Sequence, residues 1–124
     1  MPDWWSLYPA WRVSRLEVQE PYGWHVLNEK TLHSIREKLK QFETMTLNQI
    51  FVVGKKNNHA IPIRDLSAAA RKRLTELRMP DVEELYTLRL SAKERLWGVL
   101  TQNIISLLWW DPNHEVCPSE LKNT

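Results

Sequence analysis

Three short segments rich in leucine, isoleucine and aromatic residues follow one another near the end of the chain, at about 84–90, 95–100 and 104–110. The breaks between them are of hairpin length, and strands joined by such short connections pair in antiparallel order. The third segment (IISLLWW) is apolar at odd and even positions alike, as a strand is when both of its faces are covered. We therefore expect the chain to end in an antiparallel meander of three or more strands.

Two amphipathic helices are predicted before this meander, at about 28–44 and 65–77, with Asn28 and Asp65 as candidate N-caps. The apolar residues that recur at helical spacing are Leu32, Ile35, Leu39 and Phe42 in the first helix and Leu66, Ala70, Leu74 and Leu77 in the second. Residues 45–51 are predicted to form a last helical turn or a short extra helix, and residues 54–62 a polar loop.

The start of the chain completes the predicted fold. Rough alternation of apolar and polar residues favours a strand over 11–18, and residues 1–10 are predicted to form an irregular arm. A length of 124 residues suits a single domain over 1–124. The expected fold class is α+β: an N-terminal strand, two helices packed on one face of a curved sheet, and then the meander.

Composition limits the compartment and the ligands. The single Cys117 excludes an internal disulfide, no apolar run approaches the roughly 18 residues that span a bilayer, and no signal-peptide pattern opens the chain. We expect a cytoplasmic protein with no membrane partner. Three glycines and four scattered histidines provide neither a Gly-rich phosphate loop nor metal-ligand spacing, so no metal and no small-molecule cofactor is expected.

Charge is unevenly distributed, although the formal total is only +2. Residues 54–78 carry seven basic and two acidic side chains, whereas residues 79–124 carry four basic and seven acidic ones. A basic segment attracts polyanions such as RNA, although a solvated helix face has the same pattern. The candidate RNA-binding residues are Lys55, Lys56, Arg71, Lys72, Arg73 and, as a stacking surface, Trp97.

Side chains that suit RNA cleavage gather in the last third of the chain. Attack by a 2′-hydroxyl needs a base, positive donors for the charge that develops on the phosphate, and an acid for the leaving oxygen. Arg89 and Arg95, on adjacent predicted strands, suit the phosphate. His114, just past the third strand, suits proton transfer, and Glu84 or Glu115 would be the complementary carboxylate.

Each of these residues also has a plainer interpretation. The arginines can form surface ion pairs with Glu84 or Glu94, and His114 can simply cap the end of its strand. The strand register also matters: if residue 89 pairs with residue 95, both arginines share one face of the sheet, and if residue 90 pairs with residue 95, they lie on opposite faces. The sequence leaves this choice open.

The same region resembles the C-terminal half of the RelE/ParE toxin superfamily. The resemblance rests on Met79-Pro80-Asp81 near a helix end, the strand Tyr86–Leu90, the short turn Ser91–Lys93, and Arg95-Leu96-Trp97 opening the next strand. The segment Trp109–His114 (WWDPNH) also matches the WWDPxH signature that ends one branch of the superfamily.

The resemblance implies roles for individual residues. Arg95 matches an arginine that contacts the phosphate in the RNA-cleaving members, and Arg89 matches a basic residue on the preceding strand. His114 is the nearest equivalent of the residue at the end of the last strand that acts on the scissile phosphate.

The function that we expect from the resemblance is that of a toxin in a type II toxin–antitoxin system. Such a toxin would cleave mRNA, with or without the ribosome, and would be silenced by a cognate antitoxin protein. Two alternatives remain: a toxin of the same fold that inhibits a protein target such as a topoisomerase, and an interaction module without catalytic activity.

Overall fold

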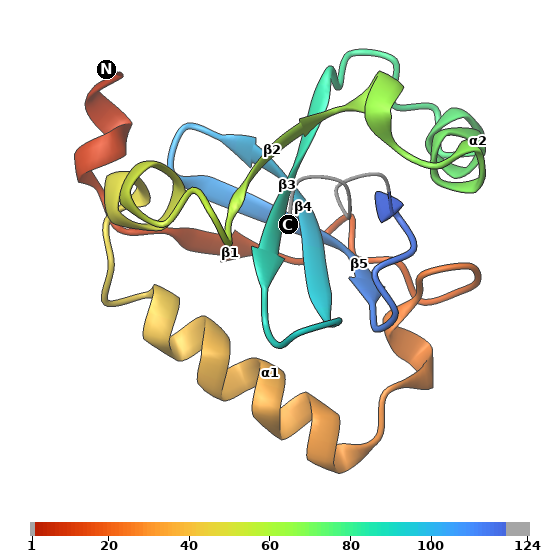
Figure 1. Cartoon of the computed structure of the whole chain (residues 1–124), viewed down its shortest axis with the longest axis horizontal. Coiled ribbons are helices and arrows are strands. Elements are labelled where there is room, and N and C mark those ends of the chain that lie inside the picture. The colour runs from red at the N-terminus through yellow and green to blue at the C-terminus, as the bar shows by residue number, and fades with distance from the viewer. Residues whose placement is uncertain (1, 119–124) are drawn as a thin grey trace.

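A computed structural model describes residues 2–118 and shows an α+β fold built on one mixed sheet of five strands (Figure 1). The strands are β1 (Ala10–Arg12), β2 (His59–Pro62), β3 (Glu84–Arg89), β4 (Arg95–Thr101) and β5 (Ile104–Asp111). Their order across the sheet is β1-β5-β4-β3-β2. The predicted meander is confirmed as β3-β4-β5, and β1 lies parallel to β5 at one edge.

The two helices, α1 (Glu29–Phe42) and α2 (Ala68–Glu76), cover opposite faces of this sheet (Figure 1). Ile35 and Phe42 of α1 pack in one apolar cluster, and Ala70 and Leu74 of α2 pack in another. Our prediction that both helices share one face is therefore wrong. The signal for two covered faces was present in β5, where every residue after Ile104 is buried, so that each face needs its own cover.

Polar side chains begin both helices. The side chain of Asn28 accepts a hydrogen bond from the Thr31 N–H (2.8 Å), which confirms the predicted cap of α1. The second helix begins later than predicted, because the cap is Ser67, which accepts from the Ala70 N–H (3.2 Å), and not Asp65. No helix in the described part of the chain is long and apolar enough to cross a membrane.

The predicted strand 11–18 is mostly wrong, because regular pairing of β1 ends at Arg12 opposite Ser106. Two residues further along β5, Leu108 forms a bulge in the β4–β5 ladder. Beyond β1 the chain stays beside β5 without forming a strand. The Glu17 N–H donates to the Leu108 carbonyl (3.0 Å), and the Trp110 N–H donates to the Tyr22 carbonyl (2.9 Å).

The predicted polar loop 54–62 contains a short edge strand, β2, that was not predicted. Only Ile61 of this strand is buried, so its pattern shows little alternation, and Pro62 is tolerated because β2 lies at the edge of the sheet. Residues Gln49–Val53 before it form a short π-helix, in agreement with the predicted short extra helix.

The N-terminal arm contains one helical turn, Asp3–Ser6, that packs against the α1 side of the sheet. Trp5 contacts Phe51 edge to face, with ring centroids 6.1 Å apart. The Leu47 N–H donates to the Leu7 carbonyl (2.9 Å), which ties the arm to the segment after α1.

A buried ion pair joins the irregular segment 13–23 to α2 and to β5. The Glu17 carboxylate accepts two hydrogen bonds from the Arg73 guanidinium, from Nε at 2.7 Å and from Nη2 at 2.8 Å. It also accepts from the Trp109 indole N–H (3.2 Å). Because the Glu17 side chain is only 7% exposed and that of Arg73 only 13%, removing one partner leaves the other charge poorly solvated.

We therefore expect Glu17→Gln to lower the free energy of unfolding by about 3–5 kcal/mol, the usual cost of breaking a buried ion pair. The matched control is Glu20→Gln in the same segment, where the side chain is 78% exposed and the change should stay within about 0.5 kcal/mol. Urea denaturation of both proteins measures the difference, and equal losses in the two would contradict this account of Glu17.

Candidate functional site

Arg89, Arg95 and Asp111 form a row across three neighbouring strands at one end of the sheet. Arg89 pairs with Arg95, and Arg95 pairs with Asp111. Directly opposed residues on neighbouring strands have their Cα atoms about 4.5–5.5 Å apart. The structure thus selects the register in which both arginines share one face, and it places Arg95 beside the strand end that precedes His114.

The two arginines of this row differ in exposure. Arg95 is 8% exposed, and its Nη1 donates to the carbonyls of Ser91 (2.7 Å), Glu94 (3.1 Å) and Ala92 (3.4 Å). It therefore stabilises the β3–β4 loop from within. Arg89 is exposed at the end of β3, where its guanidinium can reach a ligand.

A hollow of about 290 Å³ lies beside Arg89, between the end of β3 and α1. Arg89 Nη1 donates to the Asn57 side-chain oxygen (3.3 Å), and the Arg89 N–H donates to the buried Asn58 side-chain oxygen (2.9 Å). Lys38 of α1 lines the other side. Among the residues that the structure describes, those that line this hollow include these two cations and no carboxylate, which suits an anion such as phosphate.

Of the residues predicted for RNA binding and cleavage, Arg89 lines this hollow. Lys55 and Lys56 precede Asn57 in the same loop but do not line it. Lys38 and Asn57 were missed, because only the fold brings α1 and the loop before β2 to the end of β3.

The turn that carries His114 is held by the Asp111 carboxylate, which is fully buried. The carboxylate accepts hydrogen bonds from the N–H groups of Glu115 (2.8 Å) and Val116 (3.0 Å) and from the Trp97 indole (3.1 Å). Within this turn His114 has φ 60°, a left-handed conformation that residues other than glycine seldom adopt. Backbone strain of this kind is often retained at functional sites.

Several other predicted site residues lie elsewhere. Glu84 begins β3, five residues before Arg89, which corresponds to about 16 Å along a strand. Glu115 is exposed in the His114 turn. Trp97 is 1% exposed and donates its indole N–H to Asp111, so it has no open face on which a base could stack.

The basic residues of α2 do not join the Arg89 hollow. The chain enters α2 after Pro62, which pairs with Glu84 at the opposite end of β3. Arg73 is engaged by Glu17, Arg71 Nε donates to the Leu66 carbonyl (3.2 Å), and Lys72 is exposed on the helix. The basic residues of segment 54–78 are therefore divided between the two ends of β3, and only the loop before β2 contacts Arg89.

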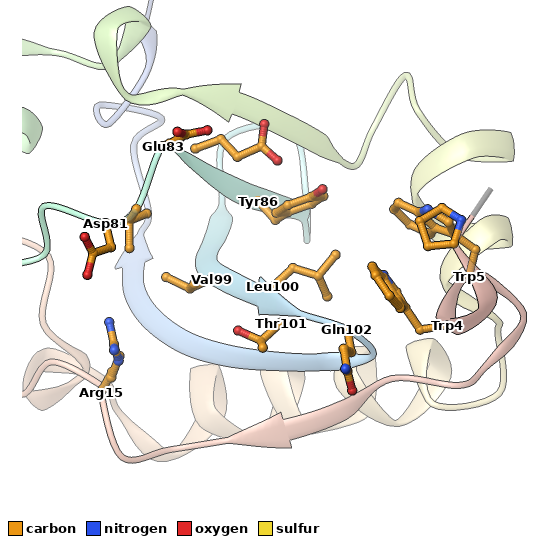
Figure 2. A pocket seen from close by; sticks show the side chains of 13 residues that line it. Trp4, Trp5, Arg15, Asp81, Glu83, Tyr86, Val99, Leu100, Thr101 and Gln102 are labelled. Atoms are coloured by element: carbon orange, nitrogen blue, oxygen red, sulfur yellow. The ribbon is translucent and has the colours of Figure 1, made fainter.

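A larger pocket, of about 580 Å³, lies toward the Glu84 end of the sheet (Figure 2). Trp4, Trp5 and Tyr86 supply aromatic walls. Figure 2 shows Trp4 and Trp5 at one end of the pocket, and Arg15 and Asp81 pointing toward one another at the other end. The sequence predicted no site here, because both tryptophans lie in the segment 1–10 that was expected to be an irregular arm. Two adjacent tryptophans in such an arm were the available signal.

Tyr86 is the most perturbed titratable side chain of this pocket. Burial, which is the largest cause, together with the negative charge of Glu84 and a hydrogen bond to its side chain, raises the pKa of Tyr86 from 10.0 to about 12. The hydroxyl therefore keeps its proton at neutral pH and is held beside the Glu84 carboxylate.

Neither site has the donor set of a metal centre. Within residues 2–118 no group of three or more His, Cys, Asp or Glu side chains is arranged to hold a metal ion.

Comparison of the chain with protein-family models gives no match, and comparisons with curated proteins and with solved structures give none either. The chemistry of the two sites therefore rests on their own residues.

The Tyr86 pKa predicts how stability depends on pH. Between about pH 10 and 12 the folded protein keeps the Tyr86 proton while the unfolded chain loses it, so the free energy of unfolding should fall as pH rises through this interval. Tyr86→Phe should remove the contribution of this proton, so that the free energy of unfolding falls less as pH rises. Urea denaturation of both proteins at pH 9 and pH 11.5 checks it, and identical pH dependence would show that Tyr86 titrates normally.

The backbone at His114 gives a second prediction. Asparagine adopts positive φ more readily than other non-glycine residues, whereas a β-branched residue does so only with strain. We expect His114→Asn to melt within a few degrees of the natural protein and His114→Val to lose about 1–3 kcal/mol. Equal melting temperatures for the two variants would show that the turn relaxes at little cost.

Proposed function

We propose that this protein is a toxin of the RelE/ParE type that cleaves mRNA, on or off the ribosome. The observation that carries the proposal is the Arg89 hollow, which is lined by Lys38 and Arg89 and by no carboxylate, and whose Asn57 follows Lys55 and Lys56 in the sequence. An anionic RNA backbone is the natural polymer that such a surface attracts. The order of strand, two helices and meander, which this fold has, is also that of the toxin superfamily.

In the proposed reaction the phosphate is held at the Arg89 end of the sheet. A base removes the proton of the 2′-hydroxyl, whose oxygen attacks the adjacent phosphorus. The bond from phosphorus to the 5′-oxygen breaks, and that oxygen receives a proton, which leaves a 2′,3′-cyclic phosphate and a 5′-hydroxyl. Arg89 would stabilise the charge on the phosphate oxygens, and Arg95 would shape the loop next to it.

His114 is the proposed proton-transfer group, because its turn follows the residue that pairs with Arg95. Glu115, exposed in the same turn, is the complementary carboxylate. Glu84 has no part in this mechanism, since it lies at the other end of β3.

Measurements of RNA affinity test whether the residues at the Arg89 hollow contact phosphate. Arg89→Gln and the double variant Lys55→Gln/Lys56→Gln should weaken binding of a single-stranded RNA and reduce its salt dependence by about one unit of slope for each lost phosphate contact. Lys72→Gln is the matched control, since it removes one exposed cation from α2. Equal weakening by Lys72→Gln would show that binding is spread over the surface and does not depend on this hollow.

Cleavage tests the chemistry. With and without ribosomes, Arg89→Gln should slow RNA cleavage by about 10²–10³-fold, the effect of losing a charge-stabilising donor. His114→Asn, which keeps the turn, should slow it by about 10²–10⁴-fold. Full activity of His114→Asn would remove His114 from the mechanism, and RNA binding without any cleavage by the natural protein would favour a non-catalytic module.

The proposed partner is an antitoxin that keeps the toxin silent in the cell. We expect expression of the chain alone to arrest growth and co-expression of the protein from the neighbouring reading frame to restore it. Growth arrest that persists in His114→Asn, together with failure to cleave RNA, would point instead to inhibition of a protein target such as a topoisomerase.

A further inference from the structure

The pocket of Figure 2 has a chemistry opposite to that of the Arg89 hollow. Of the described residues that line it, three are carboxylates, Asp81, Glu83 and Glu84, and one is a guanidinium, Arg15. Arg15 and Asp81 lie at one end of the pocket, and the carboxylates outnumber the single guanidinium by two. Such a pocket repels phosphate and attracts cations.

The aromatic wall of the pocket is fixed by edge-to-face contacts. Phe51 lies between Trp5 and Tyr86, with ring centroids 6.1 Å from the first and 4.8 Å from the second. All three aromatic side chains that line the pocket, Trp4, Trp5 and Tyr86, are only half-buried, so part of their surface remains open. An aromatic face attracts a cation placed against it, and indole does so most strongly.

The β4–β5 turn offers a second observation at the same place. Gln102 has φ 54° in this two-residue turn, where glycine is favoured because it adopts positive φ without strain. The Gln102 side chain lines the pocket beside Trp4 (Figure 2). A residue other than glycine at a left-handed turn position beside a pocket is a reason to look for a function there.

We propose that this pocket binds an organic cation, an alkylguanidinium or alkylammonium group, with Glu84 as the counter-charge and Trp4 and Tyr86 as the aromatic walls. Glu84 and Tyr86 are two residues apart on β3, so their side chains leave the same face of the sheet, and both line the pocket. At about 580 Å³ the pocket is large enough for the group together with its alkyl chain. The group can belong to a free amine or to an arginine side chain of a partner protein.

This inference does not rest on the proposed function, because the pocket lies at the end of β3 remote from Arg89. Glu84→Gln should therefore leave RNA cleavage unchanged while it weakens cation binding. Conversely, the His114→Asn protein should lose RNA cleavage and bind the cation as the natural protein does.

Titration of the full chain, followed by the indole N–H signals of tryptophans in NMR spectra, tests the proposal. Agmatine and a short end-capped peptide whose only charged side chain is one central arginine are the two cationic probes, and neutral adenosine and anionic AMP are the comparison ligands. We expect at least one cationic probe to shift the Trp4 and Trp5 signals and to bind more weakly as salt rises. Binding of agmatine supports a free amine, and binding of the peptide alone supports a partner's arginine.

Variants then test the residues. Glu84→Gln and Trp4→Leu should each weaken binding of the cationic probe by about 3–30-fold, the range expected for a lost ionic or cation–aromatic contact. Glu29→Gln, in the exposed first turn of α1, is the matched control and should have no effect. Gln102→Gly should keep or improve stability while it weakens binding, which separates a ligand contact from a folding defect.

Three results would overturn the proposal. They are the absence of any shift with both cationic probes at millimolar concentration, binding of adenosine or AMP at least as tight as that of the cations, and unchanged cation binding in a folded Glu84→Gln protein.

Discussion

Both faces of β5 have to be kept from water, and most of the fold follows from that requirement. Trp109 contributes to the cluster under α2, and Trp110 contributes to the cluster under α1. Covering two faces takes a helix on each side, which leaves the ends of the strands and the adjoining loops as the places where polar side chains can meet a ligand. Both candidate sites lie at such ends of the sheet.

The last residue of β5 links this core to the proposed chemistry. Asp111 is fully buried, and a buried carboxylate is tolerated only when donors surround it. Its donors are the indole of Trp97 in the core and two backbone N–H groups in the turn that carries His114. The core and the strained turn are therefore stabilised by the same group, so the WWDPNH segment has a structural role whether or not His114 transfers a proton.

The sequence predicted those parts of the fold that depend on local pattern. Hairpin-length breaks predicted the meander, and helical spacing located the buried residues Ile35 and Leu74. It did not predict which face each helix covers or that β2 pairs at the edge, because these depend on contacts between distant segments. The same limit applies to the site: Arg89 was identified, but Lys38 and Asn57 reach it only through the tertiary fold.

The two ends of β3 have opposite electrostatic characters. At one end Arg89 faces a hollow without carboxylates, and at the other Glu84 lies in an aromatic pocket dominated by acids. Their separation of about 16 Å along the strand exceeds the Debye length of roughly 8 Å at physiological salt, so each end attracts its own class of ligand with little interference from the other. A net charge of only +2 therefore conceals two ends of opposite electrostatic character, and under the proposed function a polyanion would be drawn to the Arg89 end and repelled from the other.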